Sequence, residues 1–207
     1  MEMKVRTRHF QRDLTMETWS RGEERSLVVI RSPAREAGSA TLRTPKGLWT
    51  YAPRADRMLR IPSGMLSESW MGSHFTNDDL LRDSSWEEDF DTTLTSAIQG
   101  GKAVLIITSI PKPDTAIVYS KVTQILDAHS HLPLRADYYD GDKIARTMEF
   151  LDVKTFSGKK LPSRLRLVPT DKPNESTEII YREMVFDQPI DESLFTARGL
   201  RKMARQR

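Results

Sequence analysis

The 207-residue chain contains no cysteine. Disulfide bonds, thiolate nucleophiles and zinc sites built from cysteine are therefore excluded. The chain also lacks long apolar runs, because the longest uninterrupted one extends only from Ala103 to Ile107. A membrane-spanning helix needs roughly 20 such residues. The sequence therefore predicts that no segment of this chain crosses a bilayer.

Motifs of common catalytic sites are missing as well. No Gly-x-Ser-x-Gly turn, which places the serine nucleophile of many hydrolases, occurs in the sequence. Glycine-rich phosphate loops of the Walker or Rossmann type are also absent. We therefore expect a protein that is not an enzyme.

Charge of one sign does not dominate, since 32 basic and 29 acidic residues are intermixed and give a net charge of +3. The exception is the basic stretch from Arg198 to Arg207, which holds no acid. Such a tail is typical of a solvated, poorly ordered end, so residues 197–207 are predicted to be one. No recognition motif accompanies it, and nucleic acid is therefore not expected as a partner.

Strand-like segments joined by turns fill most of the chain. They are rich in β-branched and aromatic residues and end at proline, glycine or aspartate, and they cover residues 3–10, 13–20, 25–32, 39–43, 48–51, 57–61, 102–110, 117–127, 134–139, 143–153, 161–168 and 177–186. The Asp140-Gly141 pair between two of them is a hairpin signal. Links this short favour antiparallel pairing.

The sequence shows no composition break, so we predict one domain over residues 1–207. Its fold class is mainly β (α+β). A twisted antiparallel sheet of about ten strands is prone to curl, and its concave side must then be filled, covered by helices or used to hold a ligand.

Helix signals are few. Thr76 and Asp79 have the spacing of a capping box, which predicts a short helix from Asn77 to about Asp83. Asp191 precedes Glu192-Ser193-Leu194-Phe195, which predicts a capped helical turn.

Two hypotheses compete for Asp127, His129 and His131. In an extended segment these side chains would share one face and could bind a zinc ion in a metal-dependent hydrolase. Alternatively, the segment is a polar turn that ends at Pro133. The turn is the favoured interpretation, because no second cluster of metal ligands accompanies it.

Large apolar residues gather in the region that contains three of the four tryptophans. Methionine adapts its shape and aromatic rings offer a wide rigid surface, a combination suited to flexible apolar ligands. The candidate lining of an apolar, lipid-binding cavity is Trp49, Tyr51, Met58, Leu59, Ile61, Met65, Leu66, Trp70, Met71, Phe75 and Trp86. An ordinary core is the alternative for each of them.

Several segments resemble the outer-membrane lipoprotein-sorting proteins of the LolA-like family. These segments are Leu48-Trp49-Thr50-Tyr51-Ala52-Pro53, Arg57-Met58-Leu59-Arg60-Ile61, the stretch from Gly72 to Leu80 (GSHFTNDDL), Leu132-Pro133-Leu134-Arg135, Gly158-Lys159-Lys160-Leu161-Pro162 and the stretch from Phe186 to Phe195 (FDQPIDESLF). The resemblance covers about residues 25–195, and its motifs are structural and not catalytic.

The resemblance implies a half-open antiparallel β-barrel, an incomplete barrel in which a few short helices cover an apolar cavity. It implies a periplasmic carrier of lipid or lipoprotein acyl chains, with no metal or redox cofactor. The sequence shows no signal peptide, so we expect that the signal peptide has been removed. An inner-membrane transporter and an outer-membrane acceptor would be its partners. A binding or sensor module beside a transporter of the resistance-nodulation-division type is the alternative. The segment from Met65 to Leu81, which contains Gly72 and follows Gly64, is the expected lid.

Overall fold

The computed structural model describes residues 1–22, 24–80, 86–113, 115 and 117–206, with the backbone alone for Trp86 and Glu87. Its strands are β1 (Glu2–Arg6), β2 (Gln11–Arg21), β3 (Arg25–Ser32), β4 (Ala40–Thr44), β5 (Gly47–Ala52), β6 (Arg57–Arg60), β7 (Phe90–Gln99), β8 (Lys102–Pro111), β9 (Lys121–Asp127), β10 (Pro133–Asp140), β11 (Lys143–Phe156), β12 (Lys159–Pro169) and β13 (Ser176–Ile180). The helices are the α-helices α1 (Trp86–Asp89) and α2 (Ala197–Arg205) and the 3₁₀ turns η1 (Pro53–Ala55), η2 (Ser63–Met65), η3 (Trp70–Gly72) and η5 (Glu192–Phe195).

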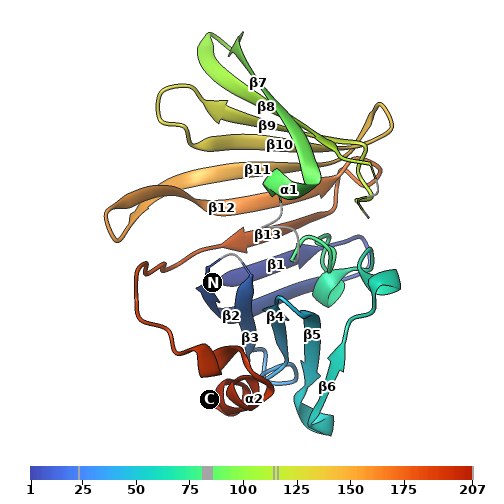
Figure 1. The fold of residues 1–207 in the computed structure, drawn as a ribbon, viewed down its shortest axis with the longest axis vertical. Coiled ribbons are helices and arrows are strands. Elements are labelled where there is room, and N and C mark those ends of the chain that lie inside the picture. Colours follow the sequence, from blue (N-terminus) through green and yellow to red (C-terminus); the bar gives the residue numbers. More distant parts are fainter. Residues whose placement is uncertain (23, 81–85, 114, 116, 207) are drawn as a thin grey trace.

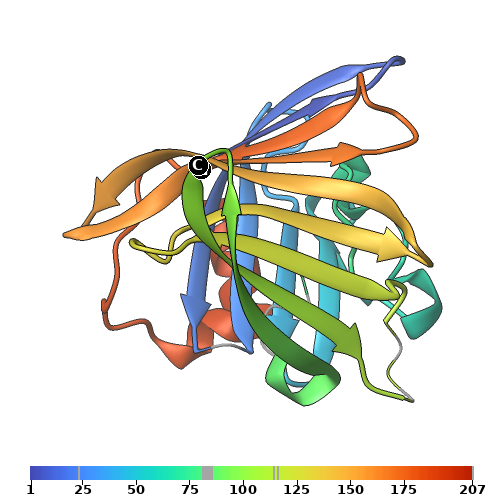
Figure 2. The same ribbon diagram turned by 90° about the horizontal axis from the view of Figure 1, so that it is seen from above.

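All 13 strands form a single antiparallel sheet in the order β6-β5-β4-β3-β2-β1-β13-β12-β11-β10-β9-β8-β7. The first strand joins the two halves of the chain, because Met3 lies opposite both Leu14 on β2 and Ile179 on β13. The sheet is strongly curved and does not close, with β6 and β7 as its edges (Figures 1 and 2). The predicted fold class, a curved, half-open antiparallel sheet, is therefore confirmed, with 13 strands in place of about ten.

Strand β7 was not predicted. Its ten residues, FDTTLTSAIQ, are exposed at nearly every position, and only Leu94 and Ile98 among them are large aliphatic residues. An edge strand that buries so little gives a weak hydrophobic pattern. Its place in the sheet depends on the long hairpin that it forms with β8, in which Leu94 lies opposite Ile107.

Two hydrophobic cores lie on opposite faces of the sheet. The concave core contains Met3, Val5, Leu14 and Met16 from the central strands together with Trp70 and Phe75 from the segment between β6 and β7. The convex core lies beneath α2 and η5 and is built from Leu27, Val29, Ala40, Leu42, Tyr51, Phe195, Leu200 and Ala204. Alternation of side chains along β3 supplies both cores, since Val28 and Ile30 belong to the first and Leu27 and Val29 to the second.

The basic tail is ordered over Ala197–Arg205, contrary to the prediction of a poorly ordered end. Thr196 caps helix α2, because its side-chain oxygen accepts from the backbone N–H of Gly199 at 3.1 Å. Leu200 and Ala204 share one helix face and are buried in the convex core. The apolar spacing of these two residues was hidden among the arginines. Asp191 caps η5 through Ser193 as predicted, at 2.9 Å.

No described helix could span a membrane, and the longest, α2, has nine residues.

Candidate functional site

The concave face of the sheet carries a largely apolar surface, with Gln124 as a polar member. Leu94, Ile107, Gln124, Ala136, Met148 and Leu167 lie opposite one another on consecutive strands from β7 to β12. Paired residues of an antiparallel sheet point to the same side. Ala136, Met148 and Leu167 belong to the concave core, so Leu94 and Ile107 extend the surface of that core toward the edge strand.

Residues 63–80, which we call the covering segment, lie over the part of this face that β1 to β3 form, which we call the near half (Figure 1). Trp70 and Phe75 are buried against the core side chains of β1 to β3, and Met71 and Leu80 pack against the same cluster. The near half is therefore filled in the way that a protein interior is filled. The expected lid matches the covering segment in position, except that Leu81 lies outside the described residues.

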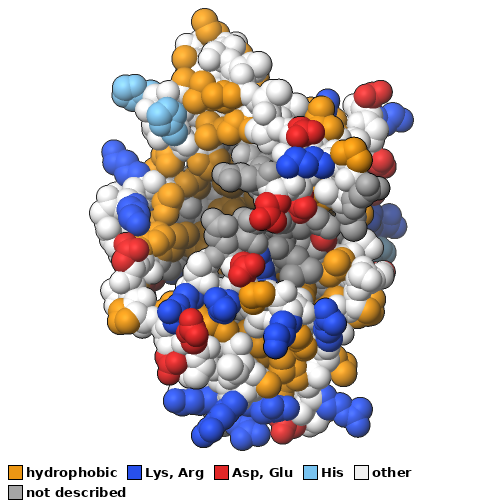
Figure 3. All heavy atoms as spheres, viewed as in Figure 1, with side chains coloured by type: hydrophobic (Ala, Val, Ile, Leu, Met, Phe, Trp, Pro, Cys, Tyr) orange, Lys and Arg blue, Asp and Glu red, His pale blue; other side chains and the backbone are white. Residues whose placement is uncertain are grey.

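The far half of the concave face, toward the edge strand β7, is open in the described part of the structure. Leu94 is 62% exposed and Ile98 is 79% exposed, while Leu105, Ile107 and Phe150 are half-buried. Figure 3 shows hydrophobic side chains gathered over β7 to β10 in the hollow of the molecule. Exposed apolar surface that continues a core is typical of a binding surface.

Two open hollows of about 540 and 510 Å³ lie elsewhere and are lined largely by polar groups. One is formed by residues 20–22 and 187–190, and the other by convex-face residues that include Lys4, Arg164 and Arg166. Neither hollow includes Leu94 or Ile98, which form the exposed part of the apolar floor among the described residues.

Polar contacts hold the covering segment on the sheet. The Trp70 indole N–H donates to Thr41 Oγ1 on β4 at 3.0 Å. Arg12 on β2 donates to the carbonyl of Met71 at 2.5 Å and pairs with Glu36. Each anchor keeps a polar group in or beside the core hydrogen-bonded. Leaving such a buried group without a partner would cost about 1–3 kcal/mol.

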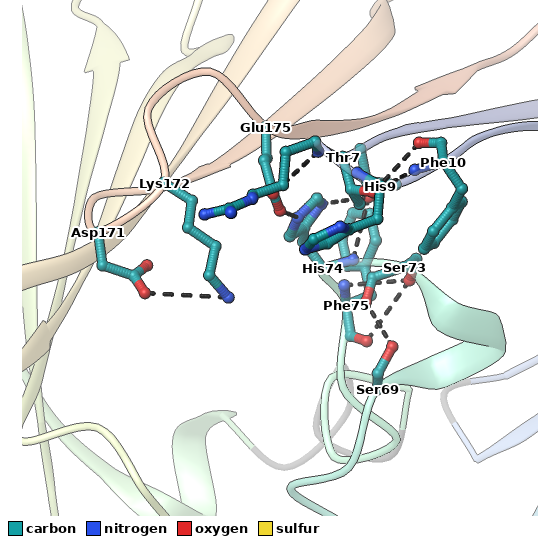
Figure 4. A network of polar contacts seen from close by, with 12 residues as sticks. Thr7, His9, Phe10, Ser69, Ser73, His74, Phe75, Asp171, Lys172 and Glu175 are labelled. Atoms are coloured by element: carbon teal, nitrogen blue, oxygen red, sulfur yellow. Dashed lines mark hydrogen bonds and ion pairs between the residues drawn. The ribbon is translucent and has the colours of Figure 1, made fainter.

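His74 provides a third anchor (Figure 4). Its backbone N–H donates to Thr177 Oγ1 at 3.0 Å, its Nδ1 lies 2.8 Å from the same oxygen, and its Nε2 lies 3.3 Å from Glu175 Oε2. Because Thr177 Oγ1 accepts from the amide, its own proton can bond Nδ1, which leaves the Nε2 proton for Glu175. His74 thus links the covering segment to β13 and the loop before it.

Glu175 is buried and bonded as a carboxylate. The backbone N–H of Arg8 donates to it at 3.0 Å, and this bond together with His74 lowers its pKa from the ordinary value of 4.5. A folded-state pKa below the unfolded one contributes stability above that ordinary value, and the contribution is lost as pH falls through the lowered pKa.

We therefore expect the free energy of unfolding of the wild-type protein to fall more steeply below about pH 4.5 than that of a Glu175→Gln variant. At neutral pH the variant should be the less stable of the two, because the amide cannot accept as the carboxylate does. Urea unfolding at pH 7 and pH 3.5 measures both quantities. Equal acid sensitivity of the two proteins would contradict this assignment.

The fourth anchor is a buried ion pair. Both Asp79 oxygens accept from Arg146 on β11, at 2.8 Å from Nη1 and 2.5 Å from Nη2. The guanidinium packs against two neighbouring rings, 4.3 Å from the centroid of Tyr138 and 4.7 Å from that of Tyr119. Asp79 also accepts from the Thr76 N–H at 2.7 Å while Thr76 Oγ1 accepts from the Asp79 N–H at 3.2 Å. The capping-box pair is confirmed, but the described residues 77–80 form a turn in place of a helix.

The predicted lining residues divide between the two faces of the sheet. Trp70, Met71 and Phe75 lie on the concave face, whereas Trp49, Tyr51 and Met58 pack in the convex core beneath α2. Leu59 and Met65 are exposed, Ile61 and Leu66 are half-buried, and the side chain of Trp86 lies outside the described residues. Nearness in sequence therefore did not place these side chains on one surface.

Sequence reasoning missed the open floor on β7 to β9. Leu94 and Ile98 stand alone in a threonine-rich stretch, and Leu105 and Ile107 belong to an apolar run without clear alternation. A period of two in β7 was the available signal. Only the register of the hairpins shows that these residues share a face with the core.

The Asp127 segment forms a turn in the structure. Asp127 Oδ1 accepts from the backbone N–H groups of His129 and Ser130 at 3.1 and 2.7 Å, and from the Ser130 hydroxyl at 2.9 Å. These bonds explain why an aspartate stands there. Within the described ranges, no group of three or more His, Cys, Asp or Glu residues is arranged to hold a metal ion.

A strongly curved, unclosed antiparallel sheet with an apolar concave face defines the LolA-like fold, and solved structures of this class match the chain. A domain from Vibrio parahaemolyticus, described as an outer membrane lipoprotein-sorting protein domain, is 22% identical with a TM-score of 0.83, over 97% of this chain and 88% of that one. A DUF1329 family protein from Desulfovibrio piger is 22% identical with a TM-score of 0.84, over 96% and 88%. A LolA superfamily protein from Nitrosomonas europaea is 20% identical with a TM-score of 0.76, over 94% and 88%.

The chain belongs to the protein family whose model, described as "Uncharacterized protein", matches residues 22–202. No curated protein matches the chain in sequence. The solved structures therefore show the LolA-like fold, as the sequence resemblance predicted.

Proposed function

We propose that this protein is a carrier that holds the acyl chains of a lipid or lipoprotein on the concave face of its sheet. The observation that carries the proposal is the largely apolar floor, which is buried beneath the covering segment and as far as Ala136 on β10, and which is exposed at Leu94 and Ile98 on the edge strand β7. A structural neighbour described as a lipoprotein-sorting domain supports it.

The energetics of such a site favour long chains. Each methylene removed from water contributes about 0.8 kcal/mol, so ten of them contribute on the order of 8 kcal/mol before the cost of association. A ligand lying along the strands of β7 to β11 would cover Leu94, Ile98 and Ile107 and extend the concave core outward. Of the predicted lining residues, Trp70, Met71 and Phe75 would then border the ligand at the edge of the covering segment. Met65 and Leu66 are more exposed members of the same segment.

The same function implies a periplasmic location, an inner-membrane transporter and an outer-membrane acceptor as partners, and no catalysis. These implications rest on the neighbours' descriptions as sorting and LolA superfamily proteins. The activity would then consist of binding and releasing the ligand, with no covalent bond made or broken.

Ligand content of the purified chain tests the proposal. We expect native mass spectrometry to find copurifying lipid, and we expect delipidated protein to bind a fluorescent fatty-acyl probe saturably, with displacement by unlabelled fatty acid. Failure of the delipidated protein to bind the probe, together with absence of lipid in the native spectrum, would refute the carrier function.

A second candidate follows from the open surface itself. An exposed apolar patch over a filled core is what a binding or sensor module needs to contact another protein. Such a module beside a transporter would use the same far half of the concave face. It predicts no lipid in the native spectrum and a change in exchange protection of β7 and β8 when the partner is added.

A further inference from the structure

A buried arginine, Arg146, lies beside the apolar part of the concave face. Arg146 lies on β11 two residues before Met148, so the two side chains point to the same side of the sheet. Arg146 is only 6% exposed, and its Nε is buried without a hydrogen-bond partner among the described residues. A buried cation on a hydrophobic surface requires an explanation, because burial of a charge is unfavourable unless the charge is paired.

The partner of this cation comes from the covering segment and not from the sheet. Asp79 presents both carboxylate oxygens to the two terminal guanidinium nitrogens, which is the geometry by which arginine binds carboxylate and phosphate oxygens. The rings of Tyr119 and Tyr138, whose centroids lie 5.1 Å apart, both pack against the guanidinium. The arrangement is an oxyanion site that a residue of the chain itself occupies.

The side chains around Arg146 change from polar to apolar along the direction of the strands. Across the strands its neighbours in register are Tyr138, then Val122, Ser109 and Thr92, a row with three hydroxyl groups. The next row along the strands runs from Met148 to Leu94 and is apolar except for Gln124. The concave face is thus polar at one end and apolar beyond it, as the surface of a bound amphiphile would require.

We propose that Arg146 is the head-group site of the concave face, that it binds a carboxylate or phosphate oxyanion at the head of an acyl chain, and that Asp79 holds the place of this anion in the ligand-free protein. The proposal rests on the carrier function. An anionic head that replaces Asp79 keeps the buried guanidinium paired and releases the covering segment. A neutral head offers no such exchange, because it would leave Arg146 bonded to Asp79.

The test compares three ligands with the same chain: dodecanoate, dodecyl phosphate and dodecanol. We expect the wild-type protein to bind the two anions at least about tenfold more tightly than the alcohol. Asp79→Asn, which removes the competing carboxylate, should strengthen binding of the anions more than that of dodecanol. A double variant, Arg146→Gln with Asp79→Asn, should bind all three with similar affinity. Inorganic phosphate alone separates a free-anion site from a lipid head-group site, because it should not compete at millimolar concentration.

The control is Arg166→Gln, which removes an arginine from the opposite face of the neighbouring strand β12, where Arg166 pairs with Glu149 at 3.3 Å. It should keep the full preference for anions. Equal affinity of the wild-type protein for the three ligands, an unchanged preference in Asp79→Asn, or an undiminished one in the double variant would overturn the head-group site while leaving the carrier function intact. Absence of binding by all three ligands would instead refute the carrier function. If the double variant does not fold, the Asp79→Asn comparison still decides the question.

Discussion

Replacement of Trp70 by alanine is expected to lower the free energy of unfolding by about 3–5 kcal/mol, the cost typical of removing a buried tryptophan. Trp70 is 4% exposed and packs in the concave core with side chains from β1, β2 and β3. Its removal leaves a cavity that the strands of a continuous sheet cannot close. It also leaves the Thr41 hydroxyl without the indole N–H that bonds it at 3.0 Å. Urea unfolding followed by circular dichroism measures the loss.

Two variants separate the parts of this effect. Trp70→Phe keeps a ring in the core but removes the N–H, and we expect it to cost about 1–2 kcal/mol. Met65→Ala alters the same covering segment at a side chain that is 48% exposed, and it should change stability by no more than about 0.5 kcal/mol. A loss below about 1 kcal/mol for Trp70→Ala would show that the covering segment is not part of the folded core.

The second large effect concerns ligand binding. We expect Leu94→Asp to weaken binding of an acyl-chain probe by about thirtyfold, which corresponds to roughly 2 kcal/mol for a polar group buried against methylenes. Leu94 lies on the open floor and is 62% exposed, so the folded protein should tolerate the change. Fluorescence titration with the delipidated variant measures the dissociation constant.

The matched control is Thr95→Asp. Thr95 is the next residue of β7 and therefore points to the opposite face, and it is exposed as well. The same charge then stands on the same strand without touching the floor, and probe binding should stay within about twofold of the wild type. Equal weakening by both substitutions would show that net charge, and not the concave floor, governs binding.

Local turn chemistry made much of the sheet predictable. The Asp140-Gly141 pair is confirmed as a hairpin between β10 and β11, with Gly141 at a φ of 56°. Segment β3 was predicted with its observed bounds, because its β-branched run is bounded by polar residues on both sides. Such signals are local: they depend on a few neighbouring residues and are readable without the fold.

Two elements escaped prediction because their own residues carry a weak apolar pattern. Strand β7 is stabilised by pairing along its whole length with the next strand, β8, which a weakly apolar sequence does not reveal. Helix α2 depends on the burial of Leu200 in a core that η5 and the strands β3 and β4 complete. For α2, contacts distant in the chain outweigh the local pattern.

The candidate site illustrates the same limit. Trp49 and Trp70 looked alike as members of one apolar region, yet Trp49 packs against the convex core beneath α2 and Trp70 packs in the concave core. Arg146 gave no signal at all, since its role depends on Asp79, Tyr119 and Tyr138 meeting around it. These four residues are brought together only when the covering segment lies on β11.

By itself, the sequence determined the antiparallel β class, most of the strands and their turns, the caps at Thr76 and Asp191 and the LolA-like resemblance. Tertiary structure alone decided which side of the sheet each apolar residue faces, where the floor stays open and which carboxylate meets the buried arginine. The physical reason is that side-chain period and turn geometry are properties of neighbours along the chain. Face and register are set by the pairing of all 13 strands at once.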